Sequence, residues 1–208
     1  MAERKKPSSS RGSLSAIRRQ AEVCRRCDLW KHATQTVFGE GRQSATIFFV
    51  GEQPGDQEDL AGRPFVGPAG RLLDKALAEA GIDRKATYVT NAVKHFKFEP
   101  RGKRRIHKKP NEMEIAACHQ WLEGELRAVD PQVVVALGAT AARAVFGRAT
   151  AIGKNRGRVI PAEQARTFTN ADVLVTVHPS YLLRVPDEDR DAAYAEFVAD
   201  LKLLARYV

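Results

Sequence analysis

Short apolar runs alternate with segments of helical spacing along most of the chain. Four short, mainly apolar segments predict strands over residues 45–51, 88–93, 133–137 and 173–177. The first of them, ATIFFVG, is a continuous apolar run, as is typical of a strand buried on both faces. Apolar residues at helical spacing predict helices over residues 15–26, 69–80, 111–129, 139–146 and 191–206. Strands that alternate with helices in this way predict a three-layer α/β/α sandwich with a central, mainly parallel four-stranded sheet.

The first segment of the chain differs from the rest in composition. Residues 1–13 are rich in Lys, Arg, Ser and Gly, so we expect a disordered basic tail followed by one domain over residues 14–208. Hydrophobic residues make up 43% of the 208 positions, which is enough for a sizeable core. No run reaches about 18 apolar residues and the start lacks an apolar signal segment, so we expect a cytoplasmic protein without a membrane partner.

Positive charge is concentrated in two segments. The formal net charge is +9, of which residues 1–27 contribute +6 and residues 94–109 contribute +7, so the remaining residues sum to −4. A mildly acidic body with two basic segments is typical of a protein that meets a polyanion at a defined place. Nucleic acid is therefore the leading partner class.

Polar side chains follow the predicted strands at the points where the strands end. Glu52 and Gln53 follow the first strand, Asn91 lies at the end of the second, and His178 follows the fourth. The carboxyl ends of parallel strands share one edge of a sheet, where ligands bind. A carboxylate there can orient a water or a nucleophile, an amide can read a flipped pyrimidine, and a histidine can stabilise a departing anionic base. The turn GEQPG could equally be a tight turn with solvated side chains.

The basic segment 94–109 follows the second strand and interleaves aromatic residues with cations. Lys103, Arg104 and Arg105 would contact phosphates and position DNA without reading its sequence. His107 is surrounded by cations, which disfavour its protonation and leave a neutral imidazole able to act as a nucleophile. The bland alternative is a solvated basic face.

Cys24 and Cys27 have the spacing of metal ligands, and Cys118 is the third cysteine. An odd number of cysteines argues against a disulfide framework and leaves a metal site or plain core thiols. Zinc and an iron–sulfur cluster are both compatible with three thiolates and one imidazole. The candidate fourth ligands are His32, His95 and His119.

Taken together, the ordered motifs resemble those of a known family. The segments GEQPG, GRPFVGPAGRLLD, YVTNAVKHF, LGATAARAVFG and VHPSYLLR are similar to motifs of the uracil-DNA glycosylase superfamily, especially its iron–sulfur branch. The segment GKRRIHK resembles the insert of the X-type members, which bond covalently to uracil-bearing DNA. The resemblance covers about residues 15–206 and implies the fold expected from the strand pattern.

The resemblance implies a role for each residue that falls in a motif. Gln53 would contact uracil, Phe65 would stack on its face and Asn91 would read its polar edge. His178 would stabilise the departing uracilate, and Ser180 would help to hold the DNA backbone.

The resemblance to the X-type members also implies covalent chemistry and a cofactor. His107 would take the place of the attacking water and stay joined to C1′ of the abasic sugar, with Glu52 orienting it or accepting its proton. The iron–sulfur branch has four cysteines where this chain has three, and His95 stands where the remaining cysteine is expected. The ligands implied for a structural [4Fe-4S] cluster are Cys24, Cys27, His95 and Cys118.

Two other functions fit the same motifs. A conventional, multiple-turnover uracil-DNA glycosylase would use the basic segment only to grip DNA. A non-catalytic nucleic-acid-binding module would hold zinc at its cysteines. The covalent enzyme is the expected function, and we expect a monomer that acts on uracil-containing DNA, preferably single-stranded, and releases uracil.

Overall fold

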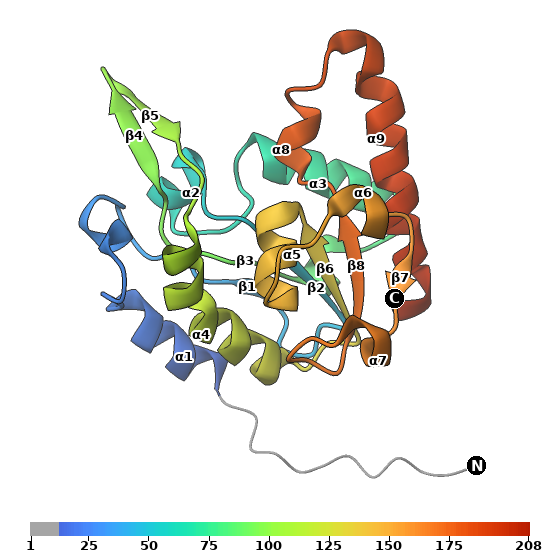
Figure 1. The fold of residues 1–208 in the computed structure, drawn as a ribbon, viewed down its shortest axis with the longest axis horizontal. Helices are drawn as coiled ribbons and strands as arrows, with labels where there is room; N and C mark the ends of the chain where they lie inside the picture. The colour runs from blue at the N-terminus through green and yellow to red at the C-terminus, as the bar shows by residue number, and fades with distance from the viewer. Residues whose placement is uncertain (1–12) are drawn as a thin grey trace.

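The computed structural model of the protein describes residues 13–208, and its core is a six-stranded sheet in the order β1-β3-β2-β6-β8-β7 (Figure 1). The expected tail over residues 1–13 falls almost wholly outside this range. The strands of the sheet are β1 (Glu40–Gly41), β2 (Ile47–Gly51), β3 (Tyr88–Asn91), β6 (Val133–Leu137), β7 (Val159–Ile160) and β8 (Asp172–Thr176).

The four predicted strands form the centre of this sheet and are parallel to one another. All residues of β2, β3 and β6 are buried, which accounts for the mainly apolar sequences of these strands. The prediction of a mainly parallel sheet is confirmed, and two antiparallel edge strands of two residues each, β1 and β7, extend it. Gly51 pairs with Asn91, so the ends of β2 and β3 are aligned.

Helices cover both faces of the sheet (Figure 1). One core lies between the sheet and helices α4 and α5, and the other lies between the sheet and α3 and α9. The helices are α1 (Leu14–Glu22), α2 (Asp56–Ala61), α3 (Pro68–Glu79), α4 (Glu112–Val129), α5 (Ala139–Phe146), α6 (Ile152–Asn155), α7 (Ala162–Ala165), α8 (Pro179–Leu182) and α9 (Asp187–Lys202). Short 3-10 turns cover Asp28–Lys31, Arg84–Ala86 and Leu203–Tyr207. None of the helices described is both long and apolar enough to cross a membrane.

Two helix starts show how local sequence sets these bounds. Asn111 Oδ1 accepts from the Glu114 N–H at 2.9 Å, and Glu114 Oε2 accepts from the Asn111 N–H at 2.7 Å, so a capping box begins α4 at the predicted residue. Helix α9 begins at Asp187, four residues before its predicted start. Three acidic residues in its first turn favour the positive helix N-terminus, a signal that apolar spacing alone does not contain.

The basic segment after β3 forms an antiparallel hairpin. Strands β4 (Phe98–Arg101) and β5 (Arg104–His107) pair in the register Phe98 to His107 and Arg101 to Arg104. Gly102 lies at the tip with φ 58°, a conformation that glycine adopts without strain. The hairpin projects away from the sheet (Figure 1), and His107 is the last residue of its second strand.

Candidate active site

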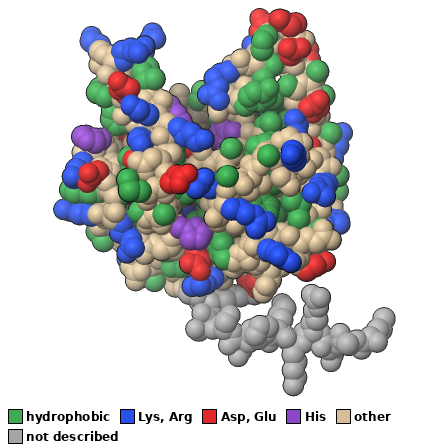
Figure 2. Space-filling model, in the orientation of Figure 1, with side chains coloured by type: hydrophobic (Ala, Val, Ile, Leu, Met, Phe, Trp, Pro, Cys, Tyr) green, Lys and Arg blue, Asp and Glu red, His purple; other side chains and the backbone are tan. Residues whose placement is uncertain are grey.

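A cavity of about 680 Å³ opens at the carboxyl edge of the central strands. Figure 2 shows the surface hollowed between two projections, the β4–β5 hairpin and the part of the chain around α8 and the start of α9. The predicted residues that line the cavity are Glu52, Gln53, Phe65, Asn91, His107, His178 and Ser180. The structure therefore brings the strand-end residues and the hairpin histidine together in one pocket.

Glu52 and His107 face each other across this pocket. Nε2 of His107 lies 3.3 Å from Oε1 of Glu52, and the two side chains are 48% and 23% exposed. The other carboxylate oxygen, Oε2, accepts a hydrogen bond from the Thr140 hydroxyl at 2.5 Å. The structure therefore places a carboxylate beside the His107 imidazole, which the sequence pattern had placed among cations.

His178 is held as a neutral hydrogen-bond donor. Its Nδ1 accepts from the Ser180 backbone N–H at 3.1 Å and lies 2.9 Å from the Ser180 hydroxyl oxygen. A backbone N–H can only donate, so Nδ1 carries a lone pair and a neutral ring has its proton on Nε2. Burial, with smaller effects from the nearby His107 and Arg184, lowers the pKa of His178 to about 4. The Ser180 hydroxyl, predicted to hold DNA, lies against this imidazole.

Asn91 and Phe65 supply a polar edge and an aromatic face. Asn91 is 3% exposed and lines the cavity, and its side-chain amide makes no hydrogen bond to any other residue of the described part. The Phe65 ring stacks on His178 with the ring centroids 6.1 Å apart. A Cβ atom on Gly51 would lie 2.3 Å from Asn91 Oδ1 and 2.7 Å from Phe65 Cζ. The glycine of GEQPG therefore lets these two side chains approach the strand end.

The Gln53 amide hydrogen-bonds the backbone at the base of the hairpin. Its Nε2 donates to the carbonyl oxygens of Lys97 and Lys108, each at 3.1 Å, and its Oε1 accepts from the Lys97 N–H at 3.2 Å. These bonds join the two chain segments that lead into and out of the hairpin. Gln53 thereby fixes the segment that carries His107, whereas the resemblance implied a contact with the base.

Arg105 does not have the role that we predicted. Its guanidinium bonds Asp56 Oδ1 at 2.5 Å and Asp59 Oδ2 at 2.6 Å, and it lies over the rings of Phe96 and Phe98. Asp59 is fully buried, so this ion pair anchors the hairpin to helix α2 and leaves Arg105 unavailable to phosphate. Lys103 and Arg104 are exposed at the hairpin tip, where DNA can reach them.

The three cysteines are neighbours in the structure. The Trp121 indole N–H donates to Cys24 Sγ at 3.2 Å, and the Lys94 backbone N–H donates to Cys118 Sγ at the same distance. Cys27 packs against the core that contains Cys118. Burial raises the pKa of Cys118 to about 12 and also raises that of Cys27, and the other thiols add to both effects. The fold therefore gathers three sulfur ligands on one side of the molecule.

The histidines considered as the fourth ligand have different surroundings. Nε2 of His95 lies 3.0 Å from the Thr36 hydroxyl oxygen, and burial lowers the pKa of this histidine. His32 is exposed, and His119 packs edge-on against Phe168. In the described part of the chain, no three His, Cys, Asp or Glu side chains are close enough to hold a single metal ion. In the described residues, the expected set of Cys24, Cys27, His95 and Cys118 therefore does not form a single-ion site.

The sequence analysis did not identify two residues at or next to the site, Lys94 and Thr140. Lys94 counted as one cation of the basic segment, but it is 1% exposed and its ammonium lies 2.5 Å from Glu125 Oε2. The same ammonium donates to the Asn91 carbonyl oxygen at 2.7 Å, so it lies directly beneath the pocket. Thr140 looks like an ordinary residue in the first turn of a helix, and nothing in the pattern connects it with Glu52.

Comparison with known proteins gives a consistent result. A family model described as the uracil DNA glycosylase superfamily matches residues 38–202. The chain is 40% identical over 172 residues to the type-4 uracil-DNA glycosylase of Thermotoga maritima, which covers 82% of this chain and 83% of that protein. It is 39% identical over 178 residues to the type-4 uracil-DNA glycosylase of Archaeoglobus fulgidus, covering 84% and 85%. For the Pyrobaculum aerophilum type-4 enzyme the identity is 35% over 194 residues, covering 91% and 92%. The chain therefore belongs to the uracil-DNA glycosylase superfamily.

Proposed function

We propose that this protein excises uracil from DNA and then bonds through His107 to C1′ of the sugar that remains. The names of the relatives support the excision of uracil. The observation that carries the covalent step is the 3.3 Å distance between His107 Nε2 and Glu52 Oε1 inside the pocket that also contains Asn91 and His178. This distance supports a role for His107 as the nucleophile and for Glu52 as its base.

Excision begins with a uracil nucleotide flipped into the pocket. The Phe65 ring offers a stacking face and the free Asn91 amide offers a donor and an acceptor for the edge of the base. When the bond between C1′ and N1 breaks, its electron pair leaves with the base as uracilate, and the sugar becomes an oxocarbenium ion. His178 then donates from Nε2 to an oxygen of the anion, as its held tautomer permits.

Capture follows at the same carbon. A ring nitrogen of His107 gives its lone pair to C1′, and the N–H proton of the resulting imidazolium passes to Glu52, which leaves a neutral N-linked adduct. A tethered imidazole has a far higher effective concentration than a chance water, so capture is favoured over hydrolysis. The bonds of Gln53 and Arg105 to the hairpin keep this imidazole in place.

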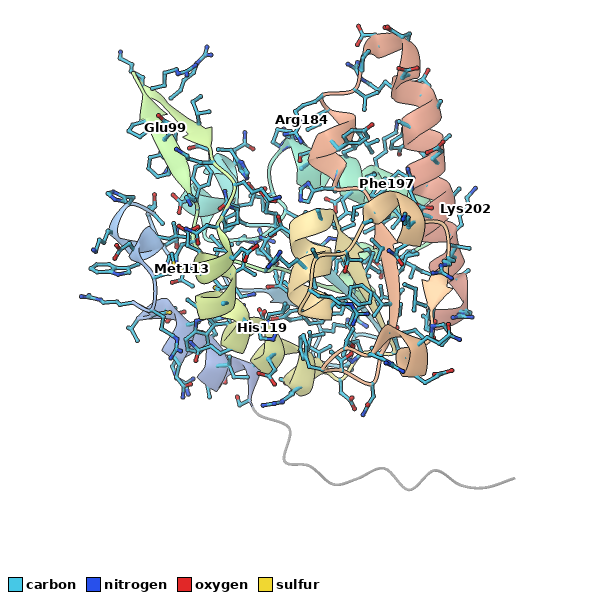
Figure 3. All side chains as sticks on the ribbon, viewed as in Figure 1. Glu99, Met113, His119, Arg184, Phe197 and Lys202 are labelled. Atoms are coloured by element: carbon cyan, nitrogen blue, oxygen red, sulfur yellow. The ribbon has the colours of Figure 1, made fainter. Side chains whose placement is uncertain are left out.

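DNA would lie in the hollow between the hairpin and α8. Lys103 and Arg104 are exposed on the hairpin, and Arg184 lines the pocket on the other side. Figure 3 shows Glu99 of the hairpin and Arg184 on opposite sides of this hollow. Cations on two walls suit the phosphates of a single strand whose flipped base enters between them. We propose that the protein acts in the cytoplasm, as a monomer.

We infer that Cys24, Cys27 and Cys118 hold a [4Fe-4S] cluster with a structural role. The three sulfurs are neighbours, and thiolates are the ligands such clusters require. When bound, the cluster would cross-link the segment after α1 to α4. We propose His95 as the fourth ligand, because only its Nε2 contacts Thr36 and its Nδ1 would be the nitrogen that binds the cluster.

The proposal is tested with a single-stranded oligonucleotide that contains one uracil. The wild-type protein should give a covalent band on a denaturing gel, with one uracil released per band formed, and the thymine oligonucleotide should give none. His107→Ala should form no band and should release uracil through attack by water. Free abasic DNA in large excess over wild-type protein would instead indicate multiple turnover, and binding without uracil release would indicate a non-catalytic module.

A further inference from the structure

We propose that Thr140 is a positioning residue for the covalent step, because its hydroxyl holds Glu52 so that the free carboxylate oxygen faces His107. This inference rests on the function proposed above. Thr140 contacts Glu52 and has no other role in the proposed reaction.

The contacts of Glu52 divide its two oxygens between two partners. Oε2 accepts from the Thr140 hydroxyl at 2.5 Å, and Oε1 lies 3.3 Å from His107 Nε2. An ionised carboxylate can only accept, so the threonine hydroxyl must be the donor in the first contact. Fixing one oxygen restricts rotation of the carboxylate about its last bond, and the other oxygen is thereby aimed at the imidazole.

The position of Thr140 makes it a rigid support. It is 3% exposed and belongs to the first turn of α5, the helix that follows the buried strand β6. The helix begins after Gly138, whose φ of 87° lets the chain turn sharply from the strand. The first turn of a helix carries partial positive charge, which favours the carboxylate next to it. Glu52 therefore meets both a fixed donor and a favourable field.

The order Thr140, Glu52, His107 has the logic of a catalytic triad, in which a third group orients the one that handles the proton. Excision itself uses Asn91 and His178, which lie in the same pocket, and neither side chain hydrogen-bonds Thr140 in the described part of the chain. Loss of the Thr140 hydroxyl should therefore impair capture by His107 more than it impairs release of uracil.

The experiment compares variants at Thr140 for two rates, uracil release and adduct formation, with the uracil oligonucleotide. Thr140→Val keeps the shape and removes the donor, and it should slow adduct formation by about ten- to a hundredfold, the effect of losing one hydrogen bond to a charged group. Thr140→Ser keeps the hydroxyl and should stay close to wild type. The ratio of free abasic DNA to adduct should rise only in the valine variant.

A matched control distinguishes positioning from general damage. Thr176 is also buried and also donates to a carboxylate, Asp200 Oδ2, at 2.5 Å, but it points to α9. Thr176→Val should leave the ratio of abasic DNA to adduct unchanged. Melting temperatures of all variants report on folding.

A double-variant cycle shows whether Thr140 acts through Glu52. In a Glu52→Gln background, adding Thr140→Val should cause little further loss of adduct formation. A wild-type rate in Thr140→Val, or an equal loss in a folded Thr140→Ser, would overturn the inference while leaving the proposed function in place. Absence of any adduct from the wild-type protein would overturn both.

Discussion

Nε2 of His107 lies 3.3 Å from Oε1 of Glu52, although one residue ends a projecting hairpin and the other follows a core strand. The carboxylate is placed by the sheet and the imidazole is placed by the hairpin. Their meeting therefore depends on how the hairpin is fixed to the body of the protein.

Replacing Glu52 with Gln should slow adduct formation by about a hundredfold or more, because an amide keeps the shape but cannot take the imidazole proton. A time course on denaturing gels measures the rate. Glu99→Gln is the matched control, since Glu99 is an exposed hairpin residue whose pair with Lys108 is 3.5 Å long. Equal rates for wild type and Glu52→Gln would remove Glu52 from the mechanism.

Two neighbouring arginines of the hairpin should behave differently. Arg104→Ala should weaken binding to uracil DNA and lower the salt dependence of the affinity by about one phosphate contact, because Arg104 is exposed. Binding titrations at several salt concentrations measure this slope. A slope equal to that of the wild type would show that Arg104 does not contact phosphate.

Arg105→Ala should instead loosen the hairpin. Asp59 is fully buried and would lose its cationic partner, so the melting temperature should fall and chymotrypsin should cleave faster at Phe98. Arg104→Ala serves as the control for both measurements. Wild-type stability and proteolysis of Arg105→Ala would contradict the anchoring role.

The free energy of unfolding should depend on the titration of His178. The pKa of His178 is about 4 in the folded protein against 6.5 for an exposed histidine, so the unfolded chain binds more protons between these values. The free energy of unfolding should therefore be unaffected by His178 above pH 6.5. It should fall by about 3 kcal/mol as the pH falls to 4. Urea unfolding at pH 7 and pH 4 measures this loss. The His178→Gln variant should lose about 3 kcal/mol less free energy of unfolding between pH 7 and pH 4 than the wild type. Equal losses in the two proteins would contradict the lowered pKa of His178.

The buried pair of Lys94 and Glu125 should matter more than a surface pair. Glu125 also accepts from the Gly39 N–H and the Tyr88 and Thr90 hydroxyls, so Lys94→Met would leave a buried carboxylate without its cation. We expect a loss of about 3–5 kcal/mol in urea unfolding. Adding Glu125→Gln to this variant should restore most of the stability.

Lys97→Met is the control for this pair. Lys97 is 21% exposed and its contact with Glu114 is 2.8 Å long, so its loss should cost about 1 kcal/mol or less. If Lys94→Met and Lys97→Met lower the free energy of unfolding equally, the buried pair of Lys94 and Glu125 is no more important for stability than the partly exposed pair.

Loading with iron and sulfide should show which residues hold the cluster. The pKa of the Cys118 thiol is about 12, so binding must displace its proton, and loading should be favoured by higher pH. Cys118→Ser should abolish the broad visible absorbance of the loaded protein. His95→Ala should weaken this absorbance, because it removes the proposed fourth ligand, and an unchanged absorbance would show that His95 is not a ligand.

The chain pattern determined the sheet because burial on both faces requires continuous apolar runs. The four predicted strands are the four parallel strands of the structure, and the strand ends brought Glu52, Asn91 and His178 to one edge. These features follow from local hydrophobicity and from the common direction of parallel strands. These features can be predicted without knowing which side chains from distant parts of the sequence are in contact.

Only the tertiary structure decided what each polar side chain does there. Arg104 and Arg105 are adjacent and chemically identical, yet one is exposed and the other is paired with buried Asp59. Lys94 is indistinguishable in sequence from the other cations of its segment, but it is buried against Glu125. Charge and spacing are local properties, whereas a side chain's partner is set by packing between segments far apart in the chain. For that reason the sequence located the pocket, and the fold assigned the roles within it.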